Sequence, residues 1–207
     1  MSDNLCHSRK DAASAYARGA QIIIGESPEH LNQYRALVPV VVSNLYQSIE
    51  ISIKYAGVES GVLQESEIRG FRSNPLPQHL QHNGHDIDLL LGAIDHRLEM
   101  DGSGAGVCAI QICAGDLVGR ELIRTMLTDS RLKSTRDAYC SRRLGYVEIE
   151  SKEVSFPTAL PAWSAATICV AESIDGAVAA LKELSGTPLE KRKHTLARIR
   201  TNVAQRA

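Results

Sequence analysis

The chain has 207 residues, of which 43% are hydrophobic, and its 23 basic side chains stand against 24 acidic ones. A hydrophobic fraction of this size can fill a core, which argues against an intrinsically disordered chain. A net charge near zero argues against a protein that coats nucleic acid by neutralising phosphates along its surface, so any contact with nucleic acid has to be local.

The cysteines do not form a recognisable framework. Their number is odd and no two are spaced as Cys-x-x-Cys, so the sequence predicts reduced, buried thiols rather than disulfides or a zinc site. They are Cys6, Cys108, Cys113, Cys140 and Cys169. The first residues lack the apolar core of a signal peptide, and no apolar run reaches the length of about eighteen residues that predicts a membrane span. We therefore expect a cytoplasmic protein without membrane contact, cofactor or metal.

Hydrophobic periodicity predicts an all-α protein. A first helix is expected over residues 9–24, where alanines share one face, and Ser-Pro-Glu at 27–29 forms the start signal of another. The strongest pattern is an apolar stripe that recurs at every fourth position and ends near Gly57. Its members are Val41, Leu45, Ile49 and Ile53. Pro39 is expected to kink or split this region.

Glu50 and Lys54 lie at the edge of this stripe. Their i,i+4 spacing, with the acid on the N-terminal side, predicts an ion pair between successive turns. If the pair is buried between helices it fixes their packing, and the loss of either partner would leave an unpaired charge. A catalytic acid–base role would need a substrate cleft, for which the sequence gives no evidence, so the structural role is favoured.

Glycines and prolines divide the middle of the chain. Residues 58–84 are too punctuated for a long regular element and predict an extended connection. Helices are expected over 85–101 and again over 107–129. The glycine-rich segment 102–106 between them could offer backbone amides to an anion. It lacks the ending of a P-loop and the strand that precedes one, so a flexible interhelix linker is the favoured interpretation.

The C-terminal third changes character twice. Residues 134–161 place a few apolar side chains among polar ones and prolines, which predicts extended chain or a short hairpin. The alanine-rich residues 162–184 return to helix, and a capping box at 187–190 opens a last helix. The predicted organisation is therefore a helical bundle over 1–133, an irregular or short β insertion over 134–161, and C-terminal helices over 162–207 that pack on the bundle or on a partner.

Lys191, Arg192 and Lys193 begin a basic stretch on the last helix. Clustered charge supports local, salt-sensitive contact with phosphate even on a neutral protein, so these residues are candidate binding residues. The same helix carries an apolar stripe through Leu196 and Ile199. Docking on the bundle or plain solvation is therefore favoured over RNA contact, and the scarcity of aromatic residues argues against base stacking.

Two segments carry a resemblance to a known family. Residues 44–54 read Asn-Leu-x-x-Ser-Ile-Glu-x-x-x-Lys, and residues 84–91 read Gly-His-Asp-x-x-x-Leu-Leu. Over roughly residues 9–130, the chain resembles the HEPN superfamily of prokaryotic helical bundles. The resemblance implies an antiparallel helical bundle, frequent homodimers, and nucleotide or RNA handling, often within defence or toxin–antitoxin systems. It also implies binding roles for the residues that match the family landmarks, which are Glu50, Lys54, His85 and Asp86.

Catalytic HEPN members are metal-independent ribonucleases with an arginine and a histidine separated by four to six residues. The histidine can move the proton of a ribose 2′-hydroxyl while the arginine holds the phosphate. Arg72 and His79 match this spacing, which chance alone also produces, and they lie in the connection rather than near a late helix. The expected late region, 136–142, contains no histidine. We therefore favour a non-catalytic or degenerate binding and assembly module, with an endoribonuclease that uses Arg72 and His79 as the alternative.

A weaker alternative is a metal-dependent enzyme. His79, His82 and His85 are three residues apart and could supply nitrogen ligands to a transition metal. Asn83 and Gly84 break any helix that would align them, so a polar loop is the favoured interpretation and no metal site is predicted. The expected partners are a second copy of the chain, RNA or a nucleotide, and a cognate protein.

Overall fold

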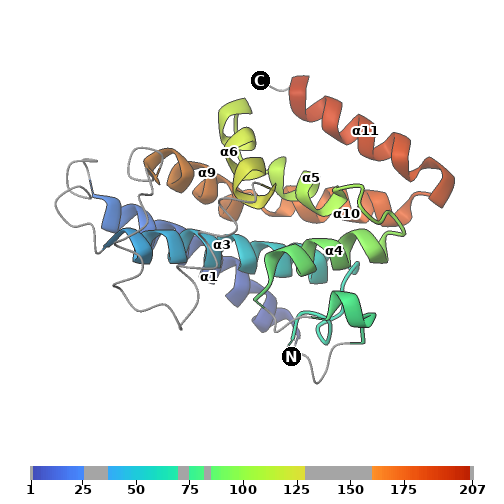
Figure 1. Ribbon diagram of the computed structural model, residues 1–207, viewed down its shortest axis with the longest axis horizontal. Helices are drawn as coiled ribbons and strands as arrows, with labels where there is room; N and C mark the ends of the chain where they lie inside the picture. Colours follow the sequence, from blue (N-terminus) through green and yellow to red (C-terminus); the bar gives the residue numbers. More distant parts are fainter. Residues whose placement is uncertain (1, 26–36, 70–74, 82–84, 129–159, 206–207) are drawn as a thin grey trace.

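The computed structural model describes residues 2–25, 37–69, 75–81, 85–128 and 160–205 (Figure 1). These residues form helices and connecting turns without a strand among them, in agreement with the predicted all-α class. The helices are α1 (Ser2–Ile24), α3 (Val38–Glu59), the short 3-10 helix η3 (Gln78–Leu80), α4 (Ile87–Arg97), α5 (Ala105–Gln111), α6 (Leu117–Thr128), α9 (Leu160–Glu172), α10 (Asp175–Gly186) and α11 (Leu189–Gln205).

The core is built around α3, which packs against α1 and α9. The stripe predicted from the sequence is its buried face, since Ile49 and Ile53 are completely buried and Leu45 is almost so. Ser48 fits on this apolar face because its hydroxyl donates a hydrogen bond of 2.8 Å to the carbonyl of Ala13 on α1. The apolar residues that repeat every fourth position are therefore the buried face of α3, as predicted.

Pro39 does not kink α3, contrary to the prediction. The helix begins at Val38, so the proline falls in its first turn, where a missing N–H costs no helical hydrogen bond. The helix ends two residues beyond the predicted Gly57, and Gly61 turns the chain away with a φ of 75°. The start signal predicted at 27–29 lies outside the described residues.

Two of the predicted helices are each divided in two. The segment expected as one helix over 107–129 forms α5 and α6, because Gly115 takes a φ of 81° and the carboxylate of Asp116 accepts the N–H of Gly119 at 2.8 Å. The segment expected over 162–184 forms α9 and α10, whose axes are bent by 60°. After these breaks, residues of α6 and α11 line a common cavity, which is described below.

The connection after α3 is anchored where it is described. Leu63 and Leu76 are buried in the common core, and the carboxylate of Glu67 is completely buried. The Nε atom of Arg97 on α4 donates to Glu67 Oε1 at 2.5 Å, and the backbone N–H of Gln64 donates to Glu67 Oε2 at 2.6 Å. This buried ion pair ties the connection to α4.

The C-terminal helices share the core of the bundle. Buried side chains of α9 and α10 belong to the same hydrophobic cluster as those of α3 and α4. In Figure 1, α11 runs back from the end of α10 over the upper side of the molecule. The insertion predicted over 134–161 lies outside the described residues except for positions 160 and 161, which begin α9.

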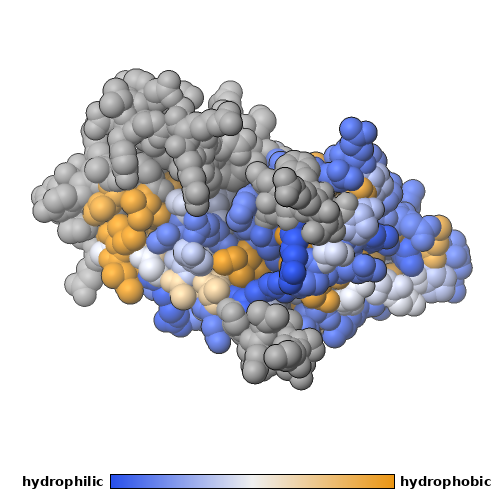
Figure 2. Space-filling view, turned by 90° about the horizontal axis from the view of Figure 1, so that it is seen from below, coloured by the Kyte–Doolittle hydropathy of each residue, from blue (hydrophilic) through white to orange (hydrophobic). Residues whose placement is uncertain are grey.

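The surface is mainly polar in the view of Figure 2, with an apolar patch at the end where α1 finishes and α3 starts. Ile22 near the end of α1 and Val40 near the start of α3 are exposed apolar residues, with 79% and 37% of their surface accessible. Among the described helices, none alone is long and apolar enough to span a membrane. The bent pair of α9 and α10 passes that test by length and composition.

Candidate functional site

Three of the residues that carry the motif resemblance, Glu50, Lys54 and His85, meet at one place on α3. Glu50 Oε1 lies 2.6 Å from the Nζ atom of Lys54 and 3.1 Å from the Nδ1 atom of His85. The Glu50 and Lys54 side chains are only 12% and 14% exposed, whereas His85 is 75% exposed. The predicted i,i+4 pair is therefore present and largely buried, and the segment before α4 brings an imidazole to it.

Asp86 has a different part in this cluster. Its carboxylate accepts the backbone N–H of Leu89 at 3.0 Å, which makes it the N-cap of α4. An acid at this position also interacts favourably with the positive end of the helix dipole. Capping therefore accounts for Asp86 without any ligand.

The residues of the nuclease and metal alternatives are only partly described. His79 is exposed on η3, and its ring meets that of His96 edge-on with the centroids 6.3 Å apart. His96 Nδ1 in turn lies 3.3 Å from a carboxylate oxygen of Asp101. Arg72 and His82 lie outside the described residues. Within the described part of the chain, no three His, Cys, Asp or Glu side chains are grouped so that they could hold a metal ion.

The basic residues of α11 divide into structural and exposed ones. Arg192 donates to the carbonyl oxygens of Leu98 at 2.6 Å and Thr187 at 2.9 Å, so it ties α11 to the end of α4. Lys191 and Lys193 are exposed. Leu196 and Ile199 are buried, as expected for a helix that docks on its own bundle.

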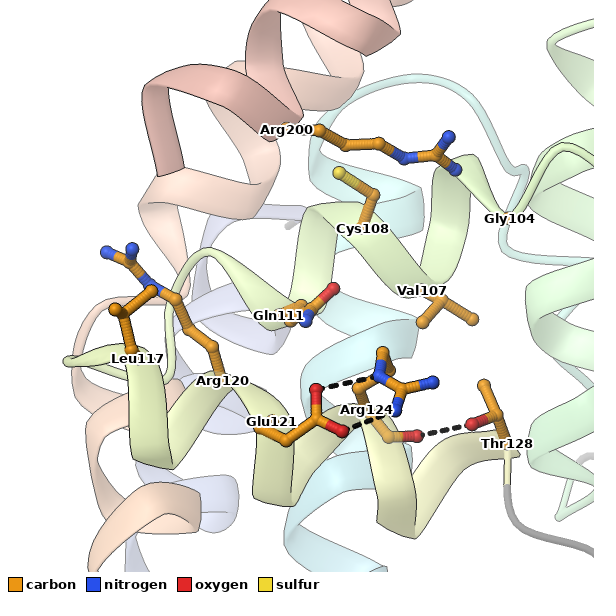
Figure 3. A pocket seen from close by; sticks show the side chains of 10 residues that line it. All are labelled: Gly104, Val107, Cys108, Gln111, Leu117, Arg120, Glu121, Arg124, Thr128 and Arg200. Carbon is orange, nitrogen blue, oxygen red and sulfur yellow. Dashed lines mark hydrogen bonds and ion pairs between the residues drawn. The ribbon is translucent and has the colours of Figure 1, made fainter. Parts of the chain in front are cut away.

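A cavity that the sequence did not predict lies between α5, α6 and α11 (Figure 3). Its volume is about 520 Å³, which is within the usual range for small-molecule sites. The residues that line it are Gly104, Val107, Cys108, Gln111, Leu117, Arg120, Glu121, Arg124, Thr128 and Arg200. Three arginines against one glutamate leave two net positive charges among these side chains.

The arginines occupy different parts of the cavity. In Figure 3, Arg200 reaches towards Gly104 at one end and Arg120 lies at the opposite end, beside Leu117. Arg124 lies along the side and pairs with Glu121, to whose Oε2 atom its Nε atom donates at 2.8 Å. The cavity is therefore elongated, with a cationic group at each end.

The floor between these ends comes from α5 and is nearly neutral. Val107 and Gln111 contribute an apolar and an amide group, and Cys108 contributes a thiol. Burial raises the pKa of the Cys108 thiol, although the guanidinium of Arg200 partly opposes the shift. The thiol therefore stays protonated near neutral pH and does not cancel the positive charge of the arginines.

The α4–α5 loop, residues 98–104, forms one edge of the cavity and is held from inside by Asp95. The two oxygens of this buried carboxylate accept the N–H groups of Gly104 at 2.8 Å and Gly106 at 2.9 Å. Two backbone amides of the glycine-rich segment, which were considered as ligands for an external anion, thus bind the protein's own carboxylate. Burial outweighs these hydrogen bonds and raises the pKa of Asp95. The expected flexible linker is in fact pinned.

Part of this cavity had a signal in the sequence. Arg120 and Arg124 are four residues apart on one helix and could have been recognised as a cationic face. Arg200 belongs to the basic C-terminal stretch, but the sequence does not show which of its cations lines the cavity. The structure selects Arg200, whose guanidinium donates to the carbonyl of Ser103 at 2.6 Å.

Comparisons with known proteins add no family to this geometry. No protein-family model matches the chain, and searches of curated proteins and of solved structures found no significant match. The resemblance to HEPN proteins therefore stays a prediction from the motifs at 44–54 and 84–91.

Proposed function

We propose that the chain is a non-catalytic, HEPN-like binding and assembly module that binds a phosphate-bearing ligand of nucleotide size in the cavity between α5, α6 and α11. The observation that carries the proposal is a cavity of about 520 Å³ whose lining includes three arginines from two helices far apart in the sequence. Arginine binds phosphate through charge-assisted hydrogen bonds and also stacks on aromatic rings.

The elongated shape favours a nucleotide over a simple phosphate ion. One guanidinium can hold the phosphates while the other stacks on a base, and the apolar Val107 and Leu117 can cover the ring or the ribose. The resemblance to HEPN proteins points to the same class of ligand. Exposed Lys191 and Lys193, also on α11, would add attraction for a longer RNA.

A binding role is favoured over catalysis by the lining itself. The described lining residues include no histidine, so they offer no imidazole to move a proton near neutral pH. Glu121 is paired with Arg124, which holds the pKa of its carboxyl below the usual range. For assembly, the proposal is a homodimer or a cognate protein partner, and the apolar patch around Ile22 and Val40 is a surface available for it.

Replacing Arg200 by alanine tests the proposed site directly. ADP serves as the probe, and its affinity is measured by isothermal titration calorimetry. The loss of a charge-assisted hydrogen bond, about 1.5–3 kcal/mol, should weaken ADP binding by about tenfold or more. Arg198→Ala is the matched control, because Arg198 has the same charge on the same helix but pairs with Glu183 outside the cavity.

The control variant should change ADP affinity by less than about threefold, the effect of one exposed charge. Equal losses in the two variants would show that ADP follows the general charge of α11 rather than the cavity. A full chain that binds neither ADP nor a short oligoribonucleotide would overturn the proposal. Tight binding of the oligoribonucleotide without ADP binding would transfer the function from the cavity to the surface of α11.

A separate assay addresses the ribonuclease alternative. The unmodified chain is incubated with a mixed RNA pool, with and without a chelator, and we expect intact RNA in both cases because the described lining lacks a proton-transferring histidine. Cleavage that resists the chelator and disappears in both His79→Ala and Arg72→Ala would establish a metal-independent endoribonuclease. Cleavage that the chelator abolishes would instead favour the metal-dependent alternative.

A further inference from the structure

We propose that α11 acts as a ligand-dependent clamp: ligand binding in the cavity and docking of α11 on the α4–α5 loop each strengthen the other. This coupling rests on the proposed function, because it needs a ligand in the cavity. It adds a regulated element to the site. The residues that carry the coupling are Arg192 and Arg200 of α11 and the loop carbonyls to which they donate.

The docking of α11 depends on few side chains. Over residues 189–201, only Leu196 and Ile199 are buried. Beyond these, the helix is held by hydrogen bonds from Arg192 to Leu98 and from Arg200 to Ser103. The ion pair of Arg198 with Glu183 on α10 is exposed and adds little. A helix with so little buried apolar surface belongs to the least stable part of a fold and opens locally more easily than the core.

Both arginine ties end on the loop that borders the cavity. Arg200 is also a cavity residue, so one side chain joins α11 to the loop and to the ligand site. A ligand held between Arg200 and the arginines of α6 would connect α11 to α6 in addition to the loop. The ligand site is complete only while α11 is docked.

The loop itself is held in an unfavourable conformation at the point where Arg192 binds it. Glu99 has a φ of 53°, the single positive φ of a non-glycine residue among those described. Arg192 donates to the carbonyl of Leu98, just before Glu99, and its Nη1 atom lies 3.9 Å from the Glu99 carboxylate. Strained backbone persists where surrounding contacts enforce it, so the docked helix helps to maintain the shape of the cavity edge.

Thermodynamic linkage then fixes what must be observed. If ligand binds the docked state and not the undocked one, the apparent affinity equals the intrinsic affinity multiplied by the fraction of molecules that are docked. By the same linkage, ligand raises that fraction. A change that weakens docking without touching the cavity must therefore weaken ligand binding, and saturating ligand must restore docking.

Arg192→Ala is the decisive variant, because Arg192 ties α11 but does not line the cavity. Hydrogen–deuterium exchange of α11 amides and calorimetric titration with ADP are measured on the full chain. We expect faster exchange in α11 without ADP, an ADP affinity at least about threefold lower, and exchange restored to that of the unmodified protein at saturating ADP. Lys182→Ala is the control, since it removes a positive charge from an exposed position on α10, outside the cavity, and should leave both quantities unchanged.

The readouts separate the two proposals. One outcome would overturn the clamp while the proposed function stands. In that outcome, ADP binds the unmodified chain without changing the exchange of α11, and it binds Arg192→Ala with equal affinity. A chain that does not bind ADP fails the proposed function itself, and the clamp with it. Unchanged exchange in α3 and α9 verifies that Arg192→Ala keeps its core. Leu196→Ala loosens the same docking by removing a buried apolar contact, so it should also speed exchange in α11 and weaken ADP binding.

Discussion

Replacing Arg97 by alanine is expected to lower the free energy of unfolding by about 3 kcal/mol, which chemical denaturation would measure. The variant removes the guanidinium that contacts the completely buried carboxylate of Glu67 through two nitrogens. Breaking a buried ion pair from one side is costly because the remaining charge stays in a poorly hydrated place. The value is at the lower end of the usual range, since the Arg97 side chain is 39% exposed and water can partly replace it.

The chain offers a matched control for this effect. Arg69 forms an ion pair with Glu65, but both side chains are substantially exposed, at 63% and 39%. Arg69→Ala should therefore cost less than about 1 kcal/mol. Similar losses in the two variants would contradict the account that burial of Glu67, rather than the ion pair as such, makes Arg97 important.

Replacing Asp95 by alanine is expected to cost about 2–4 kcal/mol of stability and to weaken ADP binding as well. The variant leaves the N–H groups of Gly104 and Gly106 without the carboxylate that accepts both. Because these amides fix the edge of the cavity, the loop that positions Arg200 loses its inner support. Thermal unfolding and ADP titration of the same variant measure the two consequences.

The pH dependence of this effect has a definite sign. Burial raises the pKa of Asp95 above its unfolded value, so the folded protein binds the proton more tightly than the unfolded chain does. The associated stability is fully present below about pH 4, the ordinary pKa of aspartate, and is lost as the pH rises through the raised folded value. The difference in unfolding free energy between the natural chain and Asp95→Asn should therefore decrease over that interval. A difference that grows with pH would contradict it.

Local patterns were enough to predict the helices that carry the core. The stripe of α3 could be recognised because its buried positions repeat with the period of the helix, and Ile49 and Ile53 are completely buried. The contact between Glu50 and Lys54 was predictable for the same reason, since residues four apart on a helix are neighbours. Such features depend on one helix and its own sequence.

The cavity depends on contacts between segments that are distant in the sequence. Its walls meet because the chain breaks at Gly115 and bends by 60° between α9 and α10. The sequence pattern predicted a single helix in each of these regions. Asp95 is a similar case. An acid in the last turn of a helix is unfavourable by itself, and only the nearby N-terminus of α5 explains it.

The position of a bound nucleotide is the most direct test of the central claim. A crystal structure of the full chain grown with ADP is predicted to show the diphosphate within hydrogen-bond distance of at least one of the guanidiniums of Arg120 and Arg200, with α11 docked as in Figure 3. ADP bound on the exposed face of Lys191 and Lys193, with water filling the cavity, would contradict the account and assign phosphate binding to the surface of α11.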